Sequence, residues 1–178
     1  MITVTKNIQL QPILEQNIQL LYQLMCKIYP PAYHHFWKDQ GAWYVNYIYT
    51  KENVIDDLKT PNTNFYFIVF KSEIVGVFRV IHGETLKGFE EKKAIKLQRL
   101  YLHQNVQGKG IGKKLMRYLI EKSTNEGFDI LWLDAMNSHT QAFNFYKNQG
   151  FKYHSHIFLP FELMHDQHRK MSQIYKIL

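Results

Sequence analysis

A glycine-rich segment has the composition of an anion-binding loop. It reads Gln107-Gly108-Lys109-Gly110-Ile111-Gly112 and lies between a predicted strand and a predicted helix. Three glycines within five residues cost backbone entropy, so some requirement must retain them. Amides at a helix N-terminus point outward, and the helix dipole favours negative charge there. Glycine content alone leaves two interpretations open, a phosphate-binding loop and a tight turn that begins a helix.

Two familiar phosphate-binding patterns do not match this segment. A Walker loop requires four residues before its Gly-Lys and then Ser or Thr, whereas three residues separate Gly108 from Gly112-Lys113, and Lys114 follows. A dinucleotide-binding loop requires G-x-G-x-x-G, and the pattern here is one residue shorter. Asp134 nevertheless lies 22 residues after Gly112, where a ribose-binding acid is expected. An NAD-type oxidoreductase therefore stays open, although an antiparallel hairpin is predicted before the loop.

The positive charge of the chain is concentrated around the same loop. The formal net charge is +7, and residues 92–122 contain nine Lys or Arg residues but one acid, Glu121. A local positive field favours an anionic partner such as nucleic acid, a membrane or a phosphorylated small molecule. No nucleic-acid-binding module is recognised, and the aromatic residues do not form a stacking platform. A phosphorylated small molecule explains the charge most simply.

The elements around the loop predict one mixed-sheet domain that spans residues 1–178. A helical pattern covers residues 11–28 and is expected to end at Pro30-Pro31, with one or two short helices in residues 32–60. Later helices are expected over 111–122 and from Asn137 or Ser138 to about Asn148. Strands are predicted at 64–70, 74–82, 94–103, 129–134, 151–159 and 171–178. This order is typical of an α/β (α+β) domain.

Two short patterns, read together, resemble the signatures of the GNAT (GCN5-related N-acetyltransferase) superfamily. Gln107-x-x-Gly110-x-Gly112 is similar to its pyrophosphate signature, and Ala142-x-x-x-Tyr146-Lys147-x-x-Gly150-Phe151 is similar to its second signature. The overall resemblance is nearest to bacterial enzymes that acetylate polyamines and similar small amines. It implies a mixed central sheet of about six or seven strands, flanked by helices, with two splayed central strands.

The resemblance also implies how acetyl-CoA would be held. The strand Leu100-Tyr101-Leu102 would pair with the pantetheine arm, and the backbone from Gln107 to Gly112 would hold the pyrophosphate, with Lys113 beside it. Many relatives carry Asn seven residues before the signature tyrosine to contact the cofactor; here that place is His139, preceded by Asn137 and Ser138. The cofactor-binding residues expected are Leu100, Tyr101, Leu102, Gln107, Gly108, Lys109, Gly110, Ile111, Gly112, Lys113, Asn137, Ser138 and His139.

The acid and the base of an acetyl transfer are assigned to different residues. Coenzyme A leaves as a thiolate, and a tyrosine with a pKa of about 10 can protonate a thiolate whose thiol pKa is about 8.5 in a dry site, so Tyr146 is the expected acid. Many relatives carry a basic Glu near the start of the central strand, where Gln98 stands here and cannot accept a proton. The base candidates are Glu84, His82, His103 and His34, or a water chain. Glu84 ranks first because it follows the neighbouring strand.

The acceptor is expected to be a primary amine of a small molecule or peptide. Residues 29–37 are rich in aromatic groups after two prolines, and Tyr33, His34 and Trp37 are the predicted acceptor-binding residues. The alternative is that these aromatic residues cover the core. The anions available to an acceptor pocket are Asp39, Glu52, Asp56 and Asp57.

The predicted function is thus acetyl-CoA-dependent N-acetyl transfer in the cytoplasm by a monomer or homodimer. A second hypothesis is a non-catalytic module that binds acyl-CoA. We expect no nucleic acid and no membrane partner, since the longest apolar run, 65–70, is too short to cross a bilayer. His154 and His156 share a strand face, but no cysteine or carboxylate stands at ligand spacing beside them, so no metal is expected.

Overall fold

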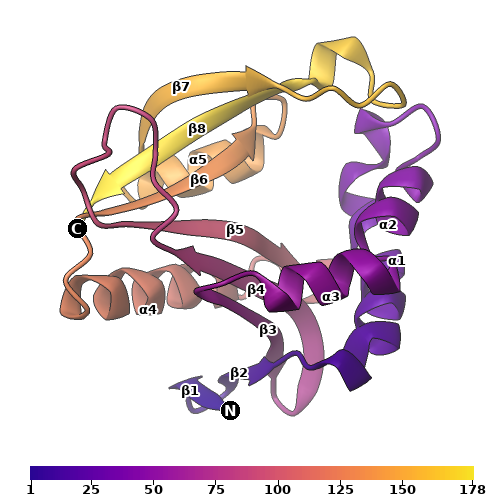
Figure 1. The fold of residues 1–178 in the computed structure, drawn as a ribbon. Coiled ribbons are helices and arrows are strands. Elements are labelled where there is room, and N and C mark those ends of the chain that lie inside the picture. The colour runs from indigo at the N-terminus through magenta and orange to yellow at the C-terminus, as the bar shows by residue number, and fades with distance from the viewer.

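The computed structural model describes residues 1–178 as one mixed eight-stranded sheet with helices on both faces (Figure 1). The strand order is β1-β2-β3-β4-β5-β6-β8-β7, and all neighbouring pairs are antiparallel except β5 and β6. The strands are β1 (Ile2–Thr5), β2 (Ile8–Pro12), β3 (Thr63–Phe70), β4 (Glu73–His82), β5 (Ala94–Leu102), β6 (Ile130–Met136), β7 (Lys152–Phe158) and β8 (Lys170–Ile177). The predicted mixed-sheet α/β fold is confirmed.

Five helices cover the sheet. They are α1 (Ile18–Tyr33), α2 (Ala42–Ile48), α3 (Lys51–Lys59), α4 (Ile111–Asn125) and α5 (Thr140–Asn148). Alternation along β3 divides the core into two layers, because Phe67 packs in the cluster with α1, whereas Ile68 packs in the cluster with α4. The β3–β4 hairpin predicted from sequence is present, and Lys71 and Ser72 form its two-residue turn with φ of 50° and 70°.

The N-terminal region differs from the sequence prediction. Two strands, β1 and β2, precede the first helix and bring the sheet to eight strands instead of six or seven. Ile13 continues the pairing of β2, since its N–H donates to the Phe65 carbonyl at 2.9 Å, and α1 therefore begins only at Ile18. Pro30 and Pro31 lie in the last turn of α1 and do not end it, because the His34 N–H still donates to the Pro30 carbonyl.

The two central strands diverge, as the resemblance implied. β5 and β6 pair only from Ala94–Ile130 to Lys96–Trp132, although β5 continues to Leu102 and β6 to Met136 (Figure 1). A bulge follows directly: Arg79 lies opposite Arg99 and Val80 opposite Leu97, which leaves Gln98 without a partner on β4. A bulge bends its strand and increases the local twist, so it accounts for the divergence.

A buried ion network fixes this bulge to α3. The Asp57 carboxylate contacts Arg79 Nη1 and Arg99 Nη1, each at 2.6 Å. Arg79 also donates a hydrogen bond to Gln98 Oε1. The side chain of Arg79 is 1% exposed, so its charge depends on these partners and not on water.

Candidate active site

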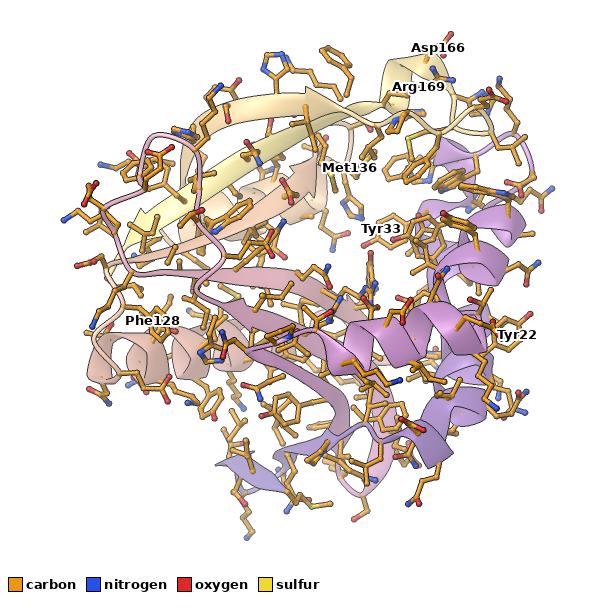
Figure 2. The ribbon with its side chains drawn as sticks, in the orientation of Figure 1. Tyr22, Tyr33, Phe128, Met136, Asp166 and Arg169 are labelled. Atoms are coloured by element: carbon orange, nitrogen blue, oxygen red, sulfur yellow. The ribbon has the colours of Figure 1, made fainter.

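A cavity of about 640 Å³ opens beside the free end of β5. In Figure 2, Tyr33 and Met136 lie on opposite sides of the space between the end of α1 and the end of β6. The wall of the cavity comes from α1, β5, the loop before α4, and α5. Its residues are Ile28, Pro31, Ala32, Tyr33, His35, Leu100, Tyr101, Leu102, Gln104, Val106, Gln107, Gly108, Gly110, Ile111, Gly112, Lys113, Ser138, His139, Thr140, Gln141, Ala142, Phe145 and Tyr146.

The glycine loop presents unpaired amides to this cavity. Gly108 and Gly110 have φ of 74° and 75°, a left-handed conformation that side chains disfavour. Their amides make no backbone hydrogen bond, and the first helical hydrogen bond of α4 runs from the Lys114 N–H to the Gly110 carbonyl at 3.1 Å. The amides of residues 111–113 therefore also lack backbone partners. This row of donors at the start of a 15-residue helix suits a pyrophosphate group.

Two further features of the loop suit an elongated ligand. A Cβ built on Gly110 would meet nothing within 4 Å, so the space in front of the loop is open. Gln107 Nε2 donates to the Leu102 carbonyl at 3.1 Å and joins the loop to the end of β5. Lys113 lines the cavity, whereas Lys109 does not.

The end of β5 provides a free backbone edge. Leu100, Tyr101 and Leu102 line the cavity, and pairing with β6 has already stopped at Lys96. Apart from the Leu102 carbonyl, which accepts from Gln107 Nε2, the N–H and C=O groups on that edge are therefore available to a ligand with amides of its own, such as a pantetheine arm. The residues predicted from the resemblance on β5 and in the loop, other than Lys109, are brought together on one wall.

Tyr146 lies on the opposite wall, on α5. Its ring packs against Phe145 and Phe151 with centroids 5.1 and 5.7 Å away, and its hydroxyl makes no hydrogen bond within the protein. Burial raises the pKa of Tyr146 above that of a free tyrosine. The phenol is therefore fully protonated at neutral pH and carries a proton that it can donate.

The residues before α5 are arranged differently from the prediction. His139 caps the helix, because its Nδ1 accepts a hydrogen bond from the Ala142 N–H at 3.2 Å, and neither Asn137 nor Ser138 does so. Asn137 accepts a hydrogen bond from Ser172 Oγ and lies outside the cavity. Ser138 and His139 do line it, and Ser138 Oγ is buried without a partner.

Glu84 lies away from the cavity. Its carboxylate contacts Lys96 Nζ at 2.7 Å, and Lys96 also contacts Asp134 at 3.0 Å. Because β4 and β5 are antiparallel, Glu84 follows β4 at the end where β5 begins, whereas the cavity lies at the far end of β5. Glu84 was predicted as the base because it follows the strand next to β5, but that position in the sequence does not show at which end of β5 the residue lies.

The other base candidates are also outside the cavity wall. His82 Nε2 bonds to Asn64, and His103 Nδ1 accepts from the Asn105 N–H. His34 Nδ1 lies 3.1 Å from the Pro30 carbonyl. Asp134, the acid of the dinucleotide hypothesis, contacts Lys96 and Gln173 instead of the cavity, so the structure does not support that hypothesis.

The aromatic segment after α1 divides between the cavity and the core. Tyr33 lines the cavity, whereas Trp37 is 2% exposed and donates from Nε1 to the Tyr29 hydroxyl at 3.0 Å. His35 lines the cavity and was missed. The signal for it was helical spacing, since Ile28, Pro31/Ala32 and His35 share one helix face once the helix is continued through the prolines.

The wall of the cavity contains no Asp or Glu. Two of the anions considered from sequence have structural partners: Asp39 accepts from the N–H groups of Gly41 and Trp43 at 3.1 and 2.5 Å, and Asp57 neutralises two arginines. The wall itself therefore has no carboxylate that could attract a polycation.

Comparison with known proteins identifies the family. Residues 19–151 match the acetyltransferase (GNAT) family. The chain is 26% identical over 104 residues to an uncharacterized N-acetyltransferase in the pepI 3′ region of Lactobacillus delbrueckii subsp. lactis, which covers 58% of this chain and 60% of that protein. It is 27% identical over 96 residues to N-acetylaspartate synthetase of Xenopus tropicalis, which covers 54% of this chain and 33% of that protein.

A solved structure extends the likeness to the whole fold. PaiA N-acetyltransferase from Thermoplasma acidophilum, in complex with coenzyme A, has a TM-score of 0.71 at 16% identity, with 96% of this chain and 99% of that chain covered. The matched stretches span less than two thirds of the two curated relatives. The chain belongs to the GNAT acetyltransferase family, which confirms the family predicted from the two signatures. No helix in the structure combines the length and apolar character needed to cross a membrane.

Proposed function

We propose that this protein transfers the acetyl group of acetyl-CoA directly to a primary amine. The observation that carries the proposal is the continuous path from the unpaired amides of the glycine loop, along the free edge of β5, to the Tyr146 hydroxyl. Acetyl-CoA, when bound, supplies an activated thioester. The family match and the N-acetyltransferase names of two relatives support the same reaction.

Separate groups of residues would bind the pyrophosphate, align the pantetheine arm and donate the proton. The amides of residues 108 and 110–113 would hold the pyrophosphate, with the Lys113 ammonium beside it. The backbone of Leu100–Leu102 would align the pantetheine arm. Tyr146 would donate its proton to the departing sulfur; the thiolate is generated in the same buried site, where desolvation also makes it a stronger base.

The acceptor would be an amine of a small molecule or peptide. Tyr33 and Tyr101 offer aromatic faces that attract an ammonium group, at about 0.5–2 kcal/mol each. The name of one relative, N-acetylaspartate synthetase, states that it makes an N-acetylated amino acid. Because the wall contains no carboxylate, we favour amines with few positive charges over polyamines.

A thiol-release assay with acetyl-CoA and an amine panel tests the proposal. The panel contains amino acids, peptides with a free N-terminus, aminoglycosides and polyamines. Release of thiol with at least one primary amine, and a product whose mass increases by one acetyl group, is the expected outcome. Tight acetyl-CoA binding without turnover on the whole panel would favour the non-catalytic acyl-CoA-binding module, and activity restricted to hydroxyl or thiol acceptors would refute amine transfer.

A further inference from the structure

A primary amine must lose a proton before it can attack a thioester. An alkylammonium group has a pKa of about 10.4, so nearly every acceptor molecule arrives protonated at neutral pH. The residue that removes this proton is not Glu84 or Gln98, because neither lines the cavity. The wall itself must supply the proton acceptor, or water must do so.

Few groups on the wall can accept a proton. It contains no carboxylate, and its titratable side chains are Lys113, three tyrosines and two histidines. Burial raises the pKa of Tyr33, Tyr101 and Tyr146, so all three remain protonated at neutral pH. A lysine side chain has hydrogen-bond donors but no acceptor, which excludes Lys113. The choice therefore lies between His35 and His139.

His139 is occupied by its structural role. Its Nδ1 accepts the Ala142 N–H at 3.2 Å, which caps α5. A neutral imidazole has one acceptor nitrogen, so the proton of His139 must be on Nε2. Its Nε2 is therefore a hydrogen-bond donor toward its surroundings, and protonation of Nδ1 would break the cap.

His35 has no such commitment. Neither ring nitrogen makes a hydrogen bond within the protein, and the ring packs on Phe36 with centroids 4.2 Å apart. Two histidine rings face it, that of the adjacent His34 at 5.5 Å and that of His168, from another segment, at 5.9 Å. The pKa of His35 is lowered, mainly by burial. Repulsion from His34, His168 and His139 lowers it further. The ring is thus neutral at neutral pH, with a free lone pair.

We infer that His35 is the catalytic proton acceptor of the acetyl transfer, a conclusion that rests on the proposed function. One nitrogen of the His35 ring takes a proton from the acceptor ammonium, and the free amine then forms the C–N bond as the C–S bond breaks. As the C–S bond breaks, Tyr146 protonates the departing sulfur. The second proton of the amine nitrogen then passes through solvent to the Tyr146 phenolate, so that Tyr146 ends the turnover protonated. The His35 imidazolium, on an exposed residue at the cavity mouth, returns its proton to solvent.

The surroundings of His35 favour rapid return of that proton. Its charged and titratable neighbours are His34 on its own turn, His168 on the turn Asp166–His168 and His139 at the start of α5. Each of them repels an imidazolium when protonated, and none is an anion that would hold the positive charge. A proton taken up by His35 is therefore not retained on the ring.

The test compares His35→Gln with wild type across pH, using the amine that gives the fastest thiol release in the panel. Loss of general-base catalysis should lower kcat/KM by about a hundredfold at pH 7. The deficit should shrink toward pH 10, because the amine then deprotonates without help. His156→Gln, on the exposed strand β7, is the matched control and should follow the wild-type profile. Acetyl-CoA affinity should be the same in all three proteins.

Two further measurements keep the outcomes distinct. Added imidazole should partly restore the activity of His35→Ala, which a purely structural role would not allow. Histidine NMR signals of the wild-type protein should show His35 titrating below pH 6.5. A His35→Gln protein with wild-type activity and pH profile, or a His35 that titrates above pH 7, would overturn the assignment; wild-type protein that acetylates no amine would instead overturn the proposed function.

Discussion

Replacing Gly110 by Asp should weaken acetyl-CoA binding by about a hundredfold while the fold survives. A Cβ on Gly110 meets nothing within 4 Å, so the new carboxylate would occupy the space in front of the loop amides. Two unit charges 4 Å apart repel by about 1 kcal/mol in water and about 4 kcal/mol near a protein surface. Because the loop is exposed, we take the repulsion between the Asp carboxylate and the pyrophosphate to be about 3 kcal/mol in total. Each 1.4 kcal/mol corresponds to about a tenfold change in affinity, so this repulsion weakens binding about a hundredfold.

The structure offers a control for backbone strain. Gly110 and Gly127 have φ of 75° and 76°, and both positions are open, but Gly127 lies beyond the far end of α4. Gly127→Asp should therefore show the same loss of stability, about 1–2 kcal/mol, without loss of affinity. Gly110→Ala should separate strain from charge and weaken binding less than Gly110→Asp.

Isothermal titration calorimetry with acetyl-CoA, on variants whose circular dichroism matches wild type, measures these affinities. The expected order is wild type, equal to Gly127→Asp, then Gly110→Ala and last Gly110→Asp. Wild-type affinity in a folded Gly110→Asp protein would refute the assignment of the loop to the pyrophosphate. A loss of equal size in Gly127→Asp would show that strain, and not charge at the loop, explains the result.

Three further predictions concern the acid, the bulge and acid stability. Tyr146→Phe should bind acetyl-CoA normally but lose about a hundredfold in kcat, measured by thiol release; near-normal turnover would make the hydroxyl dispensable. Asp57→Asn should lower the free energy of unfolding in urea by about 3 kcal/mol because it leaves two buried guanidinium groups without their anion, whereas the exposed neighbour in Asp56→Asn should change little. Between pH 7 and 5 the urea midpoint should fall, because histidines with a pKa of about 6.5 in the unfolded chain bind protons more readily than the same histidines in the folded protein. Burial is the main cause of the lowered pKa in the folded protein, and a flat profile would contradict it for His35, His82, His139 and His168.

Features carried by adjacent residues were predictable from the sequence. The glycine loop, the β3–β4 hairpin and the end of α5 at Gly150-Phe151 depend on backbone conformations within a few residues, and residue type reports these directly. Tyr146 and Gly112 were assigned to one site because each belongs to a pattern that resembles a signature of the family. The local charge excess around residues 92–122 likewise indicated an anionic ligand before any fold was known.

Features that depend on packing between distant segments were not predictable. β1 and β2 are short, and each has only two alternating apolar residues, Ile2 and Val4 and then Ile8 and Leu10, which are too few to predict a strand. The pairing of β1 with β2 and of β2 with β3 is what makes them strands. Trp37 is of a residue type that often lines a pocket, but its indole N–H donates a hydrogen bond to the Tyr29 hydroxyl and its ring is buried in the core.

The identity of the proton acceptor also depends on packing between distant segments, which the sequence did not predict. Glu84 and His35 are both plausible bases by type, and the choice between them is a matter of distance across the sheet. The antiparallel register of β4 and β5 carries Glu84 to the end of the strand remote from the cavity, where Lys96 binds it. α1 continues through two prolines to Tyr33, and the turn His34–Phe36 that follows it places His35 at the cavity. Residue types thus determined which chemistry this protein has available, and the tertiary structure decided which of those residues meet, because register and helix length act over distances that local spacing does not encode.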